Sequence, residues 1–235
     1  AAPESFESFL RDFGAELVHF ERYADHHRYS QQEVIDFINA AHEKGAELVL
    51  TTEKDAVRFP LLGRRDLPVL WMRVEIDILK DGTLDMPDDI LEELDLVVIS
   101  VHSFMELDKK TMTERVLRGM QHPNVDILAH PTGRRINRRE PFELDIEAVL
   151  EAAADLSVAV ELNANPNRLD FNDVHVHRAK ELGVPVVIST DAHSPRGLAD
   201  MRHGVDQARR GWLEPGDVLN CRSLEEMRRW LGRVR

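Results

Sequence analysis

Five acidic and histidine side chains in this sequence could bind divalent metal ions. Each falls at the end of an apolar run typical of a buried β-strand: Glu75, His102, His130, Asp191 and His193. Carboxylates and neutral imidazoles suit zinc or manganese and leave coordination positions open for water and a substrate oxygen. A bound divalent ion lowers the pKa of its water and neutralises charge on a phosphoryl oxygen. These residue types therefore indicate metal-assisted hydrolysis.

The elements that must position these side chains are apolar, β-branched runs separated by helical patterns. Strands are expected at residues 16–20, 46–51, 69–78, 94–101, 125–129, 158–162 and 184–189. Helices are expected at residues 30–44, 109–120, 144–154 and 172–182. This alternation predicts a parallel α/β fold, either a seven-stranded barrel or an open doubly wound sheet. The barrel is favoured because polar candidates follow nearly every strand, and all strands of a parallel barrel end on one face.

Composition limits the kinds of protein that the chain can be. With 235 residues and 43% hydrophobic content, one large domain is the default expectation. The net charge of −13 argues against a broad nucleic-acid-binding surface. A basic run interrupts that acidity, and we interpret it as solvated surface: Arg134, Arg135, Arg138 and Arg139. The single cysteine and the lack of a long apolar stretch predict a cytoplasmic protein without a membrane span.

The second part of the chain carries several motifs of a known family. EIDILKDGTLD, DLVVISVHS, VDILAHPTGR, ELNANPNRLD and VISTDAH resemble the PHP domain of bacterial family X DNA polymerases. The resemblance implies a distorted seven-stranded barrel that holds up to three metal ions, usually manganese or zinc, and hydrolyses phosphate esters. In the polymerases the domain is a nuclease, which implies 3'-5' exonuclease activity on single-stranded DNA ends.

The first part of the chain resembles a different family. PESFESFLRDFGAELV, ADHHRYSQQEV and GAELVLTTEKDAVRF are similar to the C-terminal portion of tetraacyldisaccharide 4'-kinase. We therefore expect a kinase-like segment at residues 1–74 joined to a PHP-like region at residues 75–235, as in a natural or engineered fusion. Both would lie in one compact barrel-like domain whose first units come from the kinase-like segment. No GxxxxGK[ST] sequence is present, which argues against kinase activity.

The PHP resemblance also assigns ligands residue by residue. Glu75, His102 and His130 match all the protein ligands of one metal site, Asp191 matches one ligand of a second, and His193 matches one ligand of a third. The opening His-x-His strand of a PHP barrel and the strand ending in Asp-His have no counterpart here. The expectation is therefore one to three ions and a hydrolytic activity impaired by the lost ligands.

Three adjacent residues of the kinase-like segment could replace the lost ligands. Asp25, His26 and His27 follow the first predicted strand, and they would face the same mouth if the first two predicted strands fill the missing barrel positions. A cap or surface role in a loop is the competing interpretation. The kinase resemblance instead places His26 near the phosphates being transferred.

The remaining candidates and alternatives stay open at the level of sequence. Arg134 and Arg168 could clamp a phosphate, or could simply face solvent. His102 and His130 could be core histidines, and Asp191 could cap a helix. Two functional alternatives to the phosphoesterase are a catalytically silent metal-binding scaffold and a phospho-glycolipid binder derived from the kinase segment.

Overall fold

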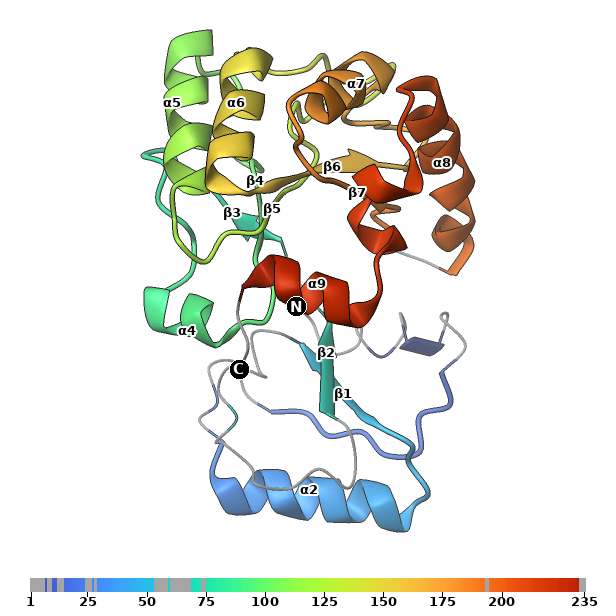
Figure 1. Ribbon diagram of the computed structural model, residues 1–235. Coiled ribbons are helices and arrows are strands. Elements are labelled where there is room, and N and C mark those ends of the chain that lie inside the picture. The colour runs from blue at the N-terminus through green and yellow to red at the C-terminus, as the bar shows by residue number, and fades with distance from the viewer. Residues whose placement is uncertain are drawn as a thin grey trace. The chain divides into compact units, whose positions relative to one another are not determined.

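The computed structural model describes residues 7, 10–11, 15–23, 27, 29–52, 59, 69–72, 75–192 and 195–232. The chain forms two compact units, Ala1–Val74 and Glu75–Arg235, which we call unit 1 and unit 2. In chain order the elements are α2 (Gln31–Glu43), β1 (Val49–Thr52), β2 (Val69–Met72), β3 (Ile76–Asp77), α4 (Asp88–Glu93), β4 (Val98–Ser100), α5 (Lys109–Met120), β5 (Ile127–Leu128), α6 (Ile146–Leu156), β6 (Ala159–Asn163), α7 (Asp173–Glu181), β7 (Val186–Ser189), η1 (Pro195–Asp200), α8 (Met201–Arg210), η2 (Pro215–Asp217), η3 (Leu219–Cys221) and α9 (Leu224–Leu231) (Figure 1).

Unit 1 is built on one amphipathic helix and a parallel strand pair. Ser30 caps α2 with a reciprocal pair of hydrogen bonds, in which its hydroxyl accepts from Glu33 N–H and the Glu33 carboxylate accepts from Ser30 N–H. Val34 and Ile38 lie one turn apart on the buried face of α2 and cluster with Val49 of β1. Strand β1 pairs in parallel with β2. The helix predicted at residues 30–44 is confirmed.

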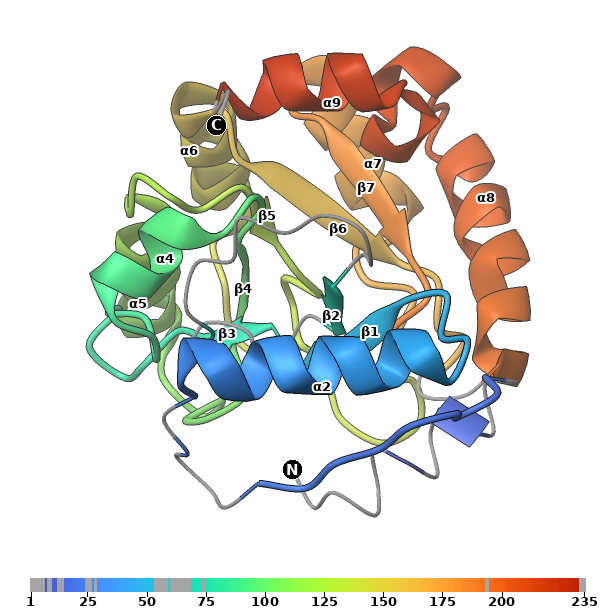
Figure 2. The same cartoon turned by 90° about the horizontal axis from the view of Figure 1, so that it is seen from below.

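Unit 2 contains a five-stranded parallel sheet in sequential order, β3-β4-β5-β6-β7. Helices follow most of the strands, and Figure 2 shows α4 to α9 arranged around the outside of these strands. All five residues of β6 are buried, as expected for a strand covered on both faces. The predicted parallel α/β architecture is confirmed. Because the strands are parallel and sequential, the loops at their carboxyl ends gather at one edge, and His102, His130 and Asp191 follow β4, β5 and β7 there.

Two strand predictions are wrong. The run at residues 69–78 is two strands, since β2 pairs with β1 whereas β3 pairs with β4 in the other sheet. In the sequence, Arg73 and Glu75 are charged positions within this run. Because both halves of the run are apolar, the pattern predicted a single strand. Residues 16–20 have no regular secondary structure. Instead, His19 of that segment stacks on Phe37 of α2, with ring centroids 5.0 Å apart.

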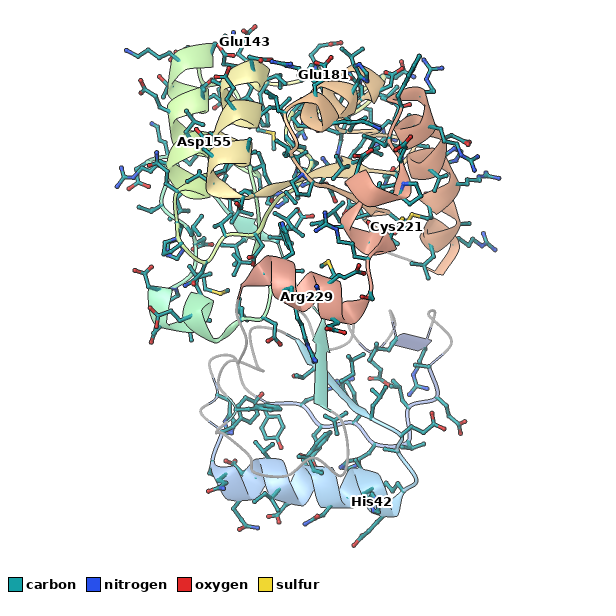
Figure 3. The ribbon with its side chains drawn as sticks, in the orientation of Figure 1. His42, Glu143, Asp155, Glu181, Cys221 and Arg229 are labelled. Atoms are coloured by element: carbon teal, nitrogen blue, oxygen red, sulfur yellow. The ribbon has the colours of Figure 1, made fainter. Side chains whose placement is uncertain are left out.

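Cys221 and Trp212 are two exposed side chains on the surface of unit 2. Cys221 is a free, exposed thiol in η3 (Figure 3). Trp212 follows the end of α8 with a φ of 61°, and its side chain is 75% exposed. No helix among the described residues has both the length and the apolar character needed to cross a bilayer.

Candidate metal centre

Unit 2 brings three of the predicted ligands together. The Oε2 atom of Glu75 lies 2.9 Å from Nε2 of His130 and 3.4 Å from Nε2 of His102. The two imidazole rings meet edge to face, with centroids 5.2 Å apart. One ligand atom from each of the three residues lies within 4.8 Å of the other two. The three side chains therefore converge on one point.

Three consecutive strands supply these residues. Glu75 directly precedes β3, so it begins its strand and does not end one, contrary to the prediction. His102 follows β4, and His130 follows β5 with a φ of 29°. A positive φ is uncommon for a residue with a side chain and marks a backbone that its surroundings hold in place. Sequential pairing of β3, β4 and β5 sets the three side chains side by side.

Asp77 fixes the loop that carries His102, a role that the sequence did not reveal. Its two carboxylate oxygens accept hydrogen bonds from His102 N–H and from the hydroxyl of Ser103, both at 2.9 Å. The hydroxyl of Ser100 lies 2.7 Å from Nε2 of His102. The His102 ring is therefore oriented both through its backbone and through its ring nitrogen, as expected for a preorganised ligand.

The electrostatics of the cluster favour a charged carboxylate beside the imidazoles. Burial opposes ionisation of Glu75, but hydrogen bonds from His102 and His130 outweigh it and hold the pKa of this carboxyl well below its usual range. Burial likewise opposes protonation of His130, but the hydrogen bond and negative charge of Glu75 raise its pKa overall. The cluster thus attracts positive charge, whether a proton or a metal ion.

Glu161 forms a second, deeper layer behind His130 and was missed at the level of sequence. It lies within β6 and is 4% exposed. Its carboxylate accepts from His130 N–H at 2.6 Å, from Asn163 at 3.3 Å and from the hydroxyl of Ser189. Burial, followed by the charge of Glu75, raises the pKa of Glu161 to about 7. The signal that could have identified it is a charged residue inside an otherwise apolar strand.

The cluster fits a divalent metal ion on its own geometry and chemistry. One carboxylate and two imidazoles form a recurrent ligand set for zinc, with bonds of about 2.0–2.2 Å. Nε2 of His130 faces Glu75 and is the ring nitrogen placed to bind such an ion. Its Nδ1 is buried and has no hydrogen-bond partner within the described part of the chain. Glu75, His102 and His130 are thus the residues that could hold a metal ion here.

Asp191 and Arg168 form a separate pair. Nε of Arg168 lies 3.1 Å from Oδ2 of Asp191, and both side chains are largely buried. Nη1 of Arg168 is buried and finds no acceptor among the described residues. Asp191 has a φ of 50°, a second positive value in this set of predicted residues. The structure therefore brings Asp191 to an arginine, and the three-ligand group does not include it.

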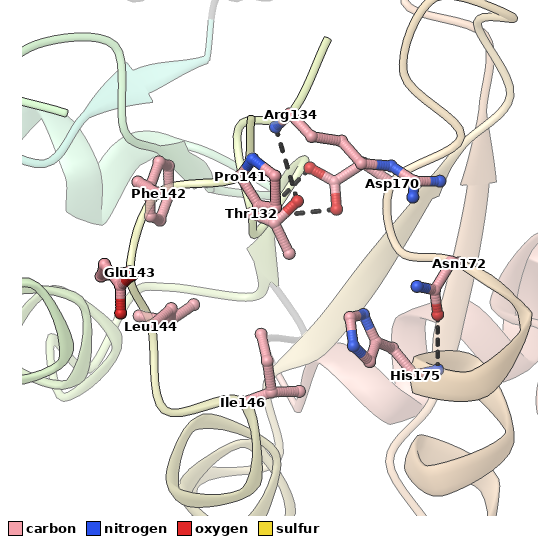
Figure 4. Close-up of a pocket in the computed structure, with 10 residues that line it drawn as sticks. All are labelled: Thr132, Arg134, Pro141, Phe142, Glu143, Leu144, Ile146, Asp170, Asn172 and His175. Atoms are coloured by element: carbon pink, nitrogen blue, oxygen red, sulfur yellow. Dashed lines mark hydrogen bonds between the residues drawn. The ribbon is translucent and has the colours of Figure 1, made fainter. Parts of the chain in front are cut away.

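Arg134 lines a pocket of about 260 Å³ at the amino ends of α6 and α7 (Figure 4). Its Nε and Nη2 donate to the backbone oxygens of Arg168 and Leu169, so most of its donors hold the neighbouring loop. Burial, followed by the charge of Arg134, lowers the pKa of His175 across the same pocket. The residues that line the pocket are Thr132, Arg134, Pro141, Phe142, Glu143, Leu144, Ile146, Asp170, Asn172 and His175.

Three predicted ligands, Asp25, His26 and His193, lie outside the described residues. Their neighbour His27 is described. Its Nε2 lies 3.2 Å from Glu33, and its ring packs against Tyr23 and Tyr29. His27 therefore belongs to an aromatic cluster of unit 1.

Comparison with known proteins places both parts of the chain. The Tetraacyldisaccharide-1-P 4'-kinase family matches residues 1–95. The DNA polymerase/3'-5' exonuclease PolX of Bacillus subtilis is 48% identical over 160 residues, which are 68% of this chain and 28% of that protein. A probable phosphatase of Shewanella amazonensis is 32% identical over 197 residues, covering 75% of each chain. A probable phosphatase of a Thermoanaerobacter species is 29% identical over 200 residues, covering 75% of this chain and 78% of the relative.

These relationships agree with the two resemblances found in the sequence. The kinase-family match extends to residue 95 and so overlaps the start of unit 2. The chain spans only about a quarter of the PolX relative, but three quarters of the Shewanella phosphatase. The N-terminal part of the chain is similar to the tetraacyldisaccharide 4'-kinases. The chain belongs to the PHP family, together with these probable phosphatases and bacterial DNA polymerase X.

Proposed function

We propose that this protein is a metal-dependent phosphoesterase whose first ion is held by Glu75, His102 and His130. The observation that carries the proposal is the convergence of one carboxylate and two imidazoles from three adjacent strands. Relatives named as phosphatases and as a 3'-5' exonuclease support the same reaction class.

A bound zinc or manganese ion would supply a nucleophilic water near neutral pH and neutralise charge on the phosphoryl group. The chain's own residues have distinct tasks around it. Asp77 holds the backbone of His102, and Glu161 holds the backbone of His130. Buried Glu161, with a pKa of about 7, can also hold or release a proton beside the cluster.

Arg168 is the residue that we propose to bind the substrate phosphate. The ion pair with Asp191 fixes its Nε edge, while Nη1 has no acceptor in the described protein. A planar guanidinium with one edge fixed presents its other donors in a defined direction, which suits phosphate oxygens. Asp191 acts in this proposal as a positioning residue. Arg134, whose donors mostly hold backbone oxygens, would support the same loop.

We further propose phosphodiester cleavage of the 3'-5' exonuclease type as the specific activity. Asp25, His26, Asp191 and His193 remain the proposed ligands of a second and a third ion. A second ion would clamp the leaving oxygen, so its loss would leave a slow enzyme.

Metal content and hydrolysis, measured together on the same preparations, test the proposal. The parent chain should bind at least one zinc or manganese ion and hydrolyse a phosphodiester, and Glu75→Gln should lose both properties. Glu151→Gln is the matched control, because Glu151 is an exposed glutamate on α6. Metal bound without hydrolysis would identify a silent metal-binding scaffold, and no bound metal in the parent chain would refute the proposal. Loss of an ion in His26→Ala would support a second site.

A further inference from the structure

A buried arginine of α5 contacts the two loops that follow β3 and β4. Arg115 is 2% exposed. Among the described residues its ion-pair partner is Asp77, and this pair is long, with 4.0 Å between Nη2 of Arg115 and Oδ1 of Asp77. A guanidinium removed from water without a close carboxylate is costly unless its donors are bound by other groups. The reason for its burial must therefore lie in its other contacts.

The donors of Arg115 are bound by backbone carbonyl oxygens of two separate loops. Nε donates to Leu79 O at 2.9 Å, and Nη2 donates to Ile78 O, directly after β3. Nη1 donates to Ser103 O at 2.8 Å and to Phe104 O at 3.4 Å, in the loop after β4. The planar fork of a guanidinium binds acceptors on two sides in fixed directions. Arg115 therefore sets the spacing between these two loops.

The loop after β4 carries the candidate ligand His102, and the contacts of Arg115 continue to it. Nη2 of Arg115 also donates to the hydroxyl oxygen of Ser103 at 3.4 Å. The Ser103 hydroxyl donates to Oδ2 of Asp77, and His102 N–H donates to Oδ1 of the same carboxylate, both at 2.9 Å. The backbone of His102 is thus connected to the buried guanidinium through Ser103 and Asp77.

Helix α5 gives Arg115 a fixed base. Asp108 caps the helix, since its carboxylate accepts from Thr111 N–H at 3.1 Å. One turn after Arg115, Gly119 packs closely on the end of β3, where an added Cβ would lie 3.0 Å from the Ile78 side chain. A side chain is preorganised when the element that carries it is itself packed in place. The loops are therefore held from a helix that is packed against one of them.

We propose that Arg115 is a positioning residue of the metal centre, which fixes His102 relative to Glu75 by binding the loops after β4 and β3. Glu75 directly precedes β3, so its place depends on the strand whose end Arg115 holds. Ligand atoms at about 2.0–2.2 Å from an ion tolerate little displacement, so a shift between the loops would weaken the site. This inference rests on the proposed phosphoesterase function and adds a residue that acts on its site only through the two loops.

Hydrogen exchange of single backbone amides, measured by NMR on metal-free full-length protein, tests whether Arg115 holds the loop. Arg115→Met replaces the guanidinium by an apolar side chain of similar length and removes every donor. Exchange of His102 N–H should then accelerate at least about tenfold more than that of His130 N–H, which donates to Glu161. Equal acceleration of the two amides would indicate a loss of global stability alone and would overturn the proposal.

A milder variant keeps the proposal testable if Arg115→Met does not fold. Arg115→Lys retains the positive charge but has one donor nitrogen in place of the fork. Its His102 N–H should again exchange faster relative to His130 N–H, by a smaller factor, and an unchanged ratio would contradict the proposal. Leu150→Ala, which truncates a buried side chain of the next helix, α6, is the matched control and should accelerate both amides equally.

Zinc affinity shows the consequence for the site. In competition with a chromophoric chelator, below the unfolding temperature of every variant, Arg115→Met should bind zinc about 10- to 100-fold more weakly than the parent. Leu150→Ala should retain the affinity of the parent, because it lowers stability without releasing the loops. An equal loss in both variants would make Arg115 a residue of general stability and overturn its role at the site.

Combining Arg115→Met with Asp77→Ala tests whether the two residues act through one loop. If they do, their effects on zinc affinity do not add, and the double variant should bind zinc about as weakly as the weaker single variant. Additive losses would show that they act separately, contrary to the proposal. A parent chain that binds no zinc would refute the proposed function, whereas hydrogen exchange of metal-free protein decides separately whether Arg115 holds the His102 loop.

Discussion

The carboxylate of Glu161 accepts a hydrogen bond from the backbone N–H of His130 at 2.6 Å, which places a buried acid directly behind a candidate metal ligand. The same carboxylate feels the charge of Glu75. A change of charge at Glu75 or His130 therefore acts on a carboxylate inside the sheet.

The first prediction concerns the pH dependence of stability. The pKa of Glu161 is raised from 4.5 to about 7 in the folded protein. Protonated Glu161 therefore contributes to the free energy of unfolding in full below pH 4.5, the pKa in the unfolded chain, and this contribution is lost as the pH rises through about 7. Glu161→Gln removes this titration. In metal-free protein, the melting temperature of the variant relative to that of the parent should rise between pH 5 and pH 8. The rise should be about 2–4 °C for each kcal/mol by which the parent's free energy of unfolding falls over this range. A constant difference across that range would contradict the assignment.

The second prediction concerns the competition between metal and protons. Glu75 raises the pKa of His130, so a proton occupies the pair at mildly acidic pH and must leave before a metal binds. The apparent affinity for zinc should therefore rise with pH through the neutral range, and binding should release protons. Calorimetry in buffers of different ionisation enthalpy measures this release directly. Affinity that does not change between pH 5.5 and 8 would exclude His130 as a ligand.

The third prediction concerns Asp77 as a positioning residue. Asp77→Ala removes the acceptor for His102 N–H and for the Ser103 hydroxyl, so the His102 ring loses its fixed orientation. Metal affinity should fall about 10- to 100-fold, as for other supporting residues of metal sites. Asp77→Asn retains one carbonyl acceptor and should recover part of the loss. Titration with a chromophoric zinc competitor separates the two variants.

The fourth prediction compares two glycines. Gly133 has a φ of 61°, and a Cβ there would lie 2.5 Å from the Phe142 ring, whereas Gly183 has a φ of 74° and nothing within 4 Å. Gly183→Ala should cost about 1–2 kcal/mol from backbone strain alone. Gly133→Ala adds a steric clash and should cost several kcal/mol in all. Urea unfolding of both variants gives the difference, and equal costs would show that Phe142 moves freely.

The sequence predicted the fold class correctly, but it did not predict all strand boundaries or the contacts between side chains of different strands. Alternating apolar runs correctly predicted the parallel α/β fold, because such periodicity reports burial. It could not divide residues 69–78 into strands of two sheets, since both halves are equally apolar. His102 and His130 were found because their motifs matched a family. Glu161 was not found, because its role depends on cross-strand contact with His130, which no local pattern encodes.

The arginine run shows a different limit. Its exposure was expected from the sequence, and Arg135 and Arg138 are exposed. Neither arginine has a carboxylate partner among the described residues. This depends on how residues 135–139 fold back on themselves, which the composition of the run cannot predict. Arg134 and Arg139, in the same run, instead hold backbone oxygens.

The three-ligand group has a consequence for how this chain could have arisen. Glu75 is the first residue of unit 2, and His102 and His130 follow from the next two strands. Every member of the group thus lies on the same side of the boundary at residue 75. Recombination at that point could exchange the preceding segment for an unrelated one without removing any of these three residues.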